Sequence, residues 1–179
     1  MKKIILTSLL GIAIYSTAFS QNKKPIWLGI QPAMTIEPFY PKGEFDLNVV
    51  PLVIQVPLTK RMDIRYTNLA NLHFGGNGGF SDIGGEVQFP IFIKKKEQIH
   101  TRSQGIYMSP LIGVGRNLVN DHYTMTPAVE GGYMFASSKR FTLTLGLQLG
   151  GSYFIYDDSD PEWRNHFGFK ANLGFWVND

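Results

Sequence analysis

The stretch FTLTLGLQLGGSYFIY, residues 141–156, alternates apolar residues with small or polar ones. Its odd-numbered positions are nearly all hydrocarbon, whereas its even-numbered positions are mostly threonine, glycine, glutamine and serine. Because strand side chains point alternately to the two faces of a sheet, the pattern predicts a strand with one apolar and one polar face. From Phe141 to Tyr153 this strand spans about 40 Å, or about 30 Å of height once tilted, which matches the thickness of a bilayer's hydrocarbon.

The same alternation recurs along the chain and predicts an all-β fold of eight strands. The candidate strands are residues 28–36, 48–58, 62–74, 83–93, 105–114, 123–135, 141–156 and 163–177. The connections alternate between short or basic ones (59–61, 94–103, 137–139) and glycine-rich, acidic or turn-forming ones (40–43, 75–79, 117–121, 157–161). An even number of strands places both chain ends on one side, as an antiparallel up-and-down barrel requires.

Proline lacks the backbone donor of a strand ladder, and several prolines fall inside these candidate strands. We expect several of them to lie at bulges or strand ends. The prolines concerned are Pro32, Pro51, Pro57, Pro90, Pro110 and Pro127.

The polar strand positions are mostly small or uncharged, and charged residues make up only 17% of the chain. Such residues suit a narrow, filled lumen better than a water-facing exterior, so we expect the apolar face to contact lipid. An open sheet edge in lipid leaves backbone groups without hydrogen-bond partners, and a transmembrane barrel must therefore close. Aromatic residues at both ends of the apolar stripes predict two interfacial girdles, although a soluble sandwich could also place them in its core. The girdle candidates are Tyr123, Tyr133, Phe135, Phe141, Tyr153, Trp163 and Phe175.

The N-terminal residues carry the pattern of a secretory signal peptide. Lys2 and Lys3 precede an uncharged, apolar run that ends in Ala18-Phe19-Ser20. We therefore expect residues 1–20 to be a cleaved signal peptide, with a retained anchor helix as the alternative, and residues 21–179 to form one barrel domain. The sequence has no cysteine, which excludes a lipid-anchored lipoprotein and a thiolate metal site.

Together, the leader followed by Gln21, the eight alternating segments and the closing stretch 167–177 (FGFKANLGFWV) resemble the small outer-membrane β-barrel domain proteins of the OmpA/OmpX type, especially their Bacteroidota relatives. The resemblance implies an integral protein of the Gram-negative outer membrane, surrounded by outer-membrane lipid and lipopolysaccharide and inserted by the barrel assembly machinery. In that family the last strand usually ends on an aromatic residue, and here Asn178 and Asp179 follow Val177. The resemblance supports the fold more than any activity, and our leading hypothesis is a non-enzymatic barrel with a structural or partner-binding role, its protein partner unknown.

Seven charged or titratable residues fall on the predicted lumen face. An eight-stranded barrel is just wide enough to be filled by side chains, so opposite charges there should pair and plug the lumen. A proton or ion pathway is the alternative interpretation. The predicted lumen residues are Asp63, Arg65, Glu86, Glu130, Arg164, His166 and Lys170.

Two further functions remain open from the sequence. Some small barrels modify lipid A with a histidine, a serine and an acid at the outer rim, and Asp121-His122 and Ser81-Asp82 lie at predicted rims, although the local motifs of those enzymes are absent. A soluble secreted lipocalin-like barrel that binds a ligand would also alternate.

The remaining patterns predict no metal site, no cofactor and no nucleic-acid partner. The four histidines (His73, His100, His122, His166) are scattered. Loss of Lys2 and Lys3 lowers the formal charge from +3 to +1. The lysine run 94–96 reads as a hydrated turn.

Overall fold

The structure is a computed structural model that describes residues 25–32, 34–35, 43–75, 78–96, 98, 102–118, 121–136, 140–156 and 160–177. The predicted signal peptide lies outside the described residues. No helix in the described part of the chain has the length and apolarity needed to cross a membrane.

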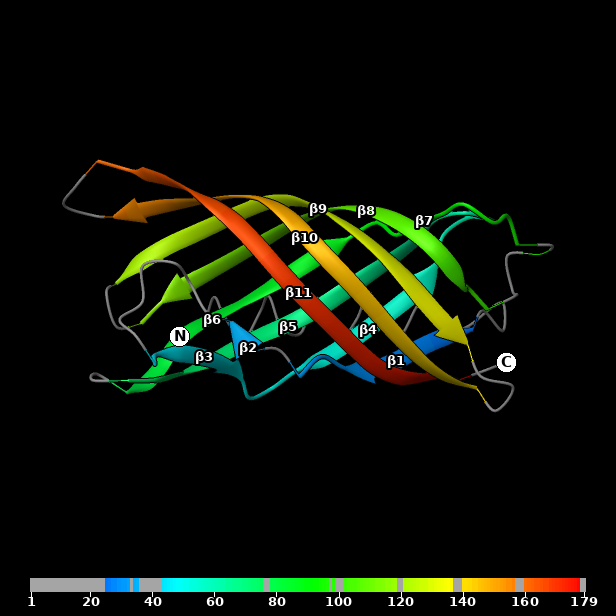
Figure 1. The fold of residues 1–179 in the computed structure, drawn as a ribbon, viewed down its shortest axis with the longest axis horizontal. Coiled ribbons are helices and arrows are strands. Elements are labelled where there is room, and N and C mark those ends of the chain that lie inside the picture. The colour runs from blue at the N-terminus through cyan, green and yellow to red at the C-terminus, as the bar shows by residue number, and fades with distance from the viewer. Residues whose placement is uncertain are drawn as a thin grey trace, which may run out of the picture.

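The described residues form eleven strands that correspond to the eight predicted ones, because three of the eight are broken in two (Figure 1). The pairs β1 and β2, β3 and β4, and β6 and β7 each replace one long predicted strand. The strands are β1 (Ile26–Ile30), β2 (Met34–Thr35), β3 (Phe45–Asn48), β4 (Leu52–Pro57), β5 (Asp63–Phe74), β6 (Gly79–Gln88), β7 (Ile91–Phe92), β8 (Gly105–Asn117), β9 (His122–Ala136), β10 (Phe141–Tyr156) and β11 (Glu162–Val177).

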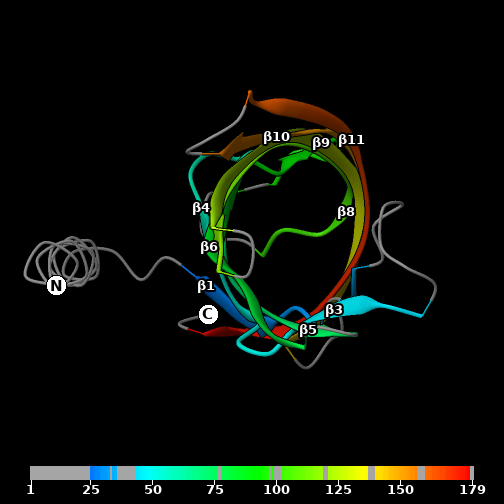
Figure 2. The same ribbon diagram turned by 90° about the vertical axis from the view of Figure 1, so that its left-hand side faces the viewer.

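The strands close into an antiparallel barrel of eight. Each member of the ring β1-β4-β5-β6-β8-β9-β10-β11 pairs with the next, and β11 pairs back with β1, with Ile26 opposite Val177. The short strands β2, β3 and β7 extend this wall, with β3 continuing the line of β4 along β5. Figure 2 looks along the barrel and shows the ring enclosing a central interior. The predicted eight-stranded closed barrel is confirmed.

Prolines explain the breaks in the long strands. Pro32, Pro51 and Pro90 lie in the gaps after β1, before β4 and before β7, where a ladder donor is not needed. Pro57 is the last residue of β4.

The other two prolines remain inside strands, next to interruptions of the pairing. Pro110 lies in β8 opposite the gap between β6 and β7, where its carbonyl accepts a hydrogen bond from the Phe89 N–H at 3.0 Å. Pro127 lies in β9 where pairing with β10 is interrupted between Ala128–Gly150 and Met125–Tyr153, and the pairing resumes in the same register. The expectation that prolines mark strand ends or irregularities is therefore confirmed.

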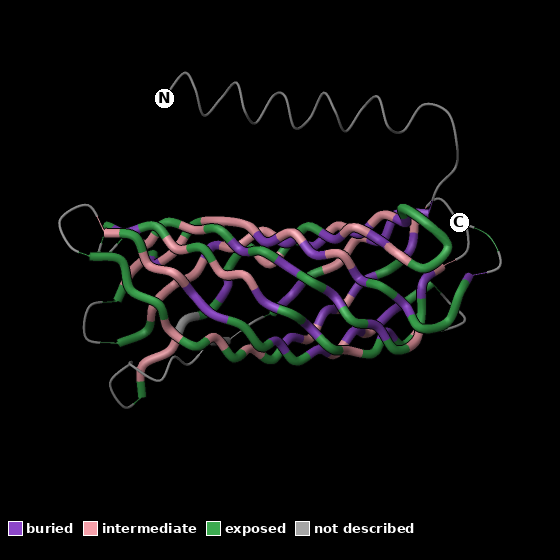
Figure 3. The backbone as a smooth tube through the Cα atoms, turned by 90° about the horizontal axis from the view of Figure 1, so that it is seen from above, coloured by how far each residue is buried: buried purple, intermediate pink, exposed green. Residues whose placement is uncertain are grey.

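The two faces of the wall are oriented as the alternation predicts. On β10, Thr142, Thr144 and Gln148 are fully buried, whereas Leu147 and Leu149 are 51% and 63% exposed. Figure 3 shows buried and exposed stretches alternating along the tubes. The interior is therefore lined largely by polar side chains, and the exterior is apolar.

The two ends of the barrel carry different connections and are called the turn end and the loop end. The turn end carries the β4–β5 turn, the segment between β7 and β8, and the β9–β10 turn, together with the start of β1 and the end of β11. The loop end carries the β5–β6, β8–β9 and β10–β11 connections. Both described chain ends therefore lie at the turn end.

Candidate functional site

Glu130 on β9 lies at the centre of a buried polar network inside the barrel. Its carboxylate accepts hydrogen bonds from the Tyr107 hydroxyl at 2.6 Å, from Gln148 Nε2 at 2.8 Å and from Gln88 Nε2 at 2.9 Å. Arg65 Nη1 lies 3.5 Å from the same carboxylate, and both side chains are fully buried. Since Arg65 is on β5, this ion pair crosses the interior past β6 and β8.

A second ion pair crosses the interior beside the first. Lys170 Nζ on β11 donates to both carboxylate oxygens of Glu86 on β6, each at 2.5 Å. Gln88 Nε2 donates to Glu86 at 2.7 Å, and Gln148 Nε2 also reaches Glu86, at 3.3 Å. The two glutamines therefore connect the Glu86 and Glu130 carboxylates, and His166 Nε2 joins the network 3.2 Å from Gln148 Oε1.

A third charged centre lies toward the turn end, around Asp63. Its carboxylate accepts hydrogen bonds from Gln55 Nε2 at 2.6 Å, from Lys96 Nζ at 2.9 Å and from the Ser103 hydroxyl at 2.5 Å. Gln55 Oε1 in turn accepts a hydrogen bond from Arg65 Nε at 2.8 Å. This glutamine therefore links the Asp63 centre to the Glu130 centre.

The prediction that residues 94–96 form a hydrated turn is wrong for Lys96. Lys94 and Lys95 are exposed, but Lys96 is only 7% exposed and its ammonium group pairs with Asp63. The Lys96 N–H donates to the Lys60 carbonyl at 2.8 Å, which turns the segment back over the mouth of the barrel. A fully buried carboxylate is costly without a counter-charge, and Lys96 supplies one.

Large apolar side chains fill the interior at the turn end. Trp27 and Trp176 are directly opposed on β1 and β11, and both are fully buried. Gly29 and Gly174 make room for them, since a Cβ at either position would collide with the Trp27 ring. The interior cluster consists of Trp27, Val53, Phe92, Tyr107, Met134 and Trp176.

The structure brings six of the seven predicted lumen residues into this network. Arg164 instead pairs with Glu162 at 2.6 Å, in a partly exposed position at the start of β11, and lies over the Phe154 ring. The six joined residues are Asp63, Arg65, Glu86, Glu130, His166 and Lys170.

Sequence reasoning did not single out the neutral members of the network or the residues of the turn-end segment. The glutamines and Tyr107 fall on the inward face of the alternation, so their parity was a usable signal, but they carry no charge. Lys96 and Ser103 lie between strands, where the alternation carries no information. The residues missed are Gln55, Gln88, Lys96, Ser103, Tyr107 and Gln148.

The charges of the three ion pairs in the network balance one another. The network pairs three cations (Arg65, Lys96, Lys170) with three carboxylates (Asp63, Glu86, Glu130). Two of the ion pairs, Arg65–Glu130 and Lys170–Glu86, join strands that are not neighbours in the wall, so these pairs cross the interior. Within the described ranges, no three histidine or acidic side chains are grouped so that they could hold a metal ion.

The rim residues of the enzyme alternative have contacts typical of strand ends. The Ser81 hydroxyl donates to the Asn71 carbonyl at 3.3 Å, and the Asp82 carboxylate accepts from Asn117 Nδ2 at 3.1 Å. Asp121 pairs with Arg116, and the His122 ring packs against Phe154 and Tyr156.

The predicted girdle aromatics gather in two groups on the outer face. Near the turn end, Phe141 lies opposite Phe175, while Leu143 and Leu145 lie opposite Phe135 and Tyr133. Near the loop end, Tyr153 lies opposite Trp163, and Tyr123 is opposite Ile155. Between the two groups, the outer-face positions of β10 are Leu147, Leu149 and Gly151.

No protein-family model matches the chain, and comparisons with curated proteins and with solved structures find no match either. The closed, eight-stranded antiparallel barrel is compatible with the OmpA/OmpX type of architecture. The same strand number also occurs in soluble barrels, so fold alone leaves the location open.

Proposed function

We propose that this chain is an integral outer-membrane barrel whose interior is plugged by side chains and whose role is structural or partner-binding. One observation carries the proposal: the charged side chains of the interior network are buried, whereas large apolar side chains are exposed on the outer face. On the outer face Ile93, Phe167 and Leu149 are 68%, 65% and 63% exposed. Inside, Asp63, Arg65 and Glu130 are fully buried.

This distribution favours lipid over water as the solvent of the outer face. Soluble monomers rarely expose contiguous apolar patches beyond a few hundred Å², and larger ones mark interaction surfaces. A lipocalin-like barrel, in contrast, encloses its ligand in a largely apolar cavity. In this barrel the polar face of the wall points inward instead, since the lumen holds three ion pairs bridged by glutamines.

The two aromatic groups support the same proposal. Tyrosine and tryptophan favour the boundary between hydrocarbon and water, because one part of the ring is apolar and another is polar. Tyr133, opposite Leu145, lies nearer the turn end and Tyr153 with Trp163 lies nearer the loop end. Leu147 and Leu149 of β10 lie between them. In this orientation the turn end faces the periplasm, and the connections of the loop end face outward to meet a partner.

Fractionation combined with a gel-shift assay tests the location. The protein should remain in the outer-membrane fraction until detergent is added, and its unboiled band should run differently from its boiled band, because a closed barrel resists detergent until heated. Recovery in the soluble periplasmic fraction without detergent, with a single gel mobility, would instead establish the lipocalin-like alternative.

A separate measurement tests the plug. Vesicles that contain the folded protein and a trapped fluorescent ion indicator should respond to external ions no faster than protein-free vesicles. Rapid entry of ions would contradict the plug and favour the ion-pathway interpretation of the same residues.

The lipid A enzyme alternative has its own test. Mass spectrometry of lipid A from a deletion strain should show the wild-type acyl pattern. A changed pattern that returns on complementation would overturn the non-enzymatic role.

A further inference from the structure

The turn end carries a cluster of exposed cations that the plug does not use. Lys60 and Arg61 lie in the β4–β5 turn, and Lys94 and Lys95 follow β7. All four side chains are exposed. We propose that these residues, the basic platform, bind the phosphate groups of anionic phospholipids in the leaflet that borders the turn end. This inference rests on the proposed membrane location.

Backbone contacts hold the two halves of the platform together. The Phe92 N–H donates to the Arg61 carbonyl at 2.7 Å, and the Lys96 N–H donates to the Lys60 carbonyl at 2.8 Å. The Thr59 hydroxyl accepts hydrogen bonds from the N–H groups of Arg61 and Met62, which fixes the turn itself. The four cations therefore belong to one ordered surface formed by two segments.

The platform adjoins exposed apolar side chains at the turn end of the wall. Ile93 precedes Lys94 and is 68% exposed, and Leu58 beside the β4–β5 turn is 40% exposed. Long basic side chains can rest their methylene stems on such apolar surface while the charged group reaches the head-group layer. The positions therefore suit cations that reach from hydrocarbon toward phosphate.

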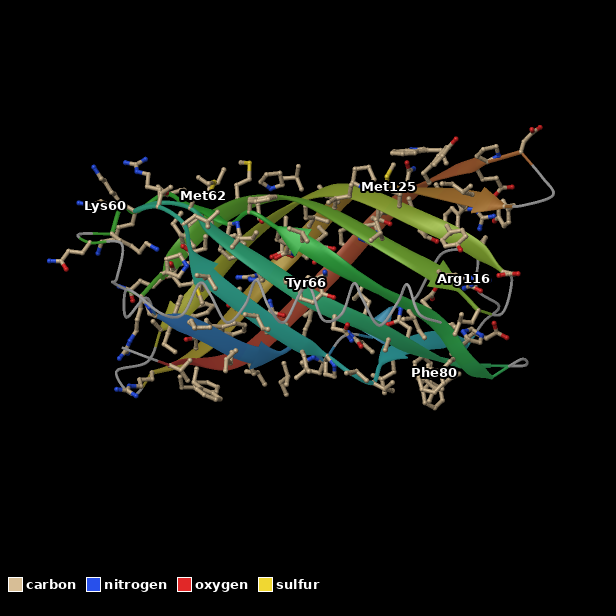
Figure 4. All side chains as sticks on the ribbon, turned by 180° about the vertical axis from the view of Figure 1, so that it is seen from behind. Lys60, Met62, Tyr66, Phe80, Arg116 and Met125 are labelled. Atoms are coloured by element: carbon tan, nitrogen blue, oxygen red, sulfur yellow. The ribbon has the colours of Figure 1, made fainter. Side chains whose placement is uncertain are left out.

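The distribution of charged residues between the two ends of the barrel agrees with binding of anionic lipid at the turn end. Among the described residues of the turn end, the single carboxylate is that of Asp63, which is buried. At the loop end, Arg116 and Arg164 are paired with Asp121 and Glu162. Figure 4 shows Lys60 and Met62 at one end of the barrel and Arg116 and Phe80 at the other. Among the described residues, the turn end therefore exposes lysine and arginine side chains but no carboxylate. Basic residues near an anionic leaflet gain binding energy.

The test measures lipid selectivity of the folded barrel in phosphatidylcholine vesicles with spin-labelled lipids. For the wild type, spin-labelled phosphatidylglycerol should associate at least about twofold more strongly than spin-labelled phosphatidylcholine. Raising the salt to about 0.5 M should reduce this preference, because exposed charges are screened. The variant with Lys60→Gln, Arg61→Gln, Lys94→Gln and Lys95→Gln should show no preference.

Two controls identify the platform as the cause. Lys60→Arg with Lys94→Arg and Lys95→Arg should keep the preference, because the charge is kept. Arg116→Gln with Arg164→Gln should also keep it, because these cations lie at the loop end.

The outcomes separate this inference from the proposed function. A wild-type protein that inserts, as judged by its gel shift, yet shows no phosphatidylglycerol preference overturns the platform alone, whereas failure to insert overturns the membrane location. If the glutamine variant does not fold, the salt dependence of the wild type and the lipid preference of the loop-end control still test whether turn-end cations bind phosphatidylglycerol. The glutamine variant can also be compared with the wild type for association with lipid A. If the variant loses association with lipid A but keeps that with phosphatidylglycerol, the cations bind the lipid of the other leaflet and the proposal is contradicted.

Discussion

Glu130 accepts hydrogen bonds from three side chains and faces Arg65, so its carboxylate links side chains of several strands. Replacing Glu130 with Gln keeps the shape but leaves the buried Arg65 guanidinium without that carboxylate. We expect the free energy of unfolding to fall by about 3–5 kcal/mol, measured by denaturant titration of the protein folded in vesicles. Glu162→Gln removes a partly exposed carboxylate paired with Arg164 and should cost less than about 1 kcal/mol. Equal effects at the two sites would contradict the buried network.

Lys95 and Lys96 are neighbours with opposite environments, which makes them a matched pair. Lys96→Met leaves the buried Asp63 carboxylate without its ammonium partner, and we expect a loss of about 3–5 kcal/mol in the same unfolding measurement. Lys95→Met changes an exposed side chain and should stay within about 0.5 kcal/mol of the wild type. A small effect at Lys96 would show that the segment does not enter the barrel mouth.

The site was only partly predictable at the residue scale. Charged residues at inward positions, such as Glu86 and Lys170, could be identified because parity alone selects a face. Their partners could not, since Glu86 and Lys170 are on strands that meet only across the closed interior. The sequence predicts a solvated Lys96, because a lysine run outside a strand gives no sign that Asp63 lies beneath it.

At the scale of elements, a glycine of β9 makes room for its neighbours β8 and β10. A Cβ at Gly132 would lie 2.5 Å from the Tyr107 hydroxyl and 2.6 Å from the Leu145 carbonyl oxygen, whereas a Cβ at the adjacent Gly131 meets nothing within 4 Å. Gly132→Ala should therefore destabilise the barrel by about 1–3 kcal/mol through overpacking. Gly131→Ala should be neutral or stabilise by up to about 1 kcal/mol, because it restricts the unfolded chain. Denaturant unfolding of both variants checks the pair, and similar losses would argue against close packing at Gly132.

Element boundaries followed from the sequence where alternation was strong and failed where proline intervened. The strand over 141–156 has the bounds that its pattern predicts. The predicted strand over 48–58 has other bounds in the structure. It is divided into β3, which begins at Phe45, and β4, and Pro51 lies between them. Alternation reports which face a residue takes, but it does not report whether backbone pairing continues through a residue that lacks an N–H.

The orientation of the whole wall makes a depth-dependent prediction. Leu147 lies near the middle of β10 and Ile155 near its end, and both are exposed. In a membrane, Leu147→Arg should cost about 2–4 kcal/mol, whereas Ile155→Arg near the interface should cost at most about 1 kcal/mol. The measurement is the unfolding free energy of both variants in vesicles. Two equally neutral substitutions would fit a barrel surrounded by water and would oppose the membrane proposal.

Pairing of β1 with β11 turns a linear chain into a wall without a first strand. Since Ile26 and Val177 lie side by side, a short peptide joining them would make the backbone circular without changing any of the ladder pairings. Opening that circle at the turn between β4 and β5 would keep the new ends on the same side of the barrel. Such a rearrangement would change which strands the connections join, but it would leave each strand with the same two neighbours in the ring.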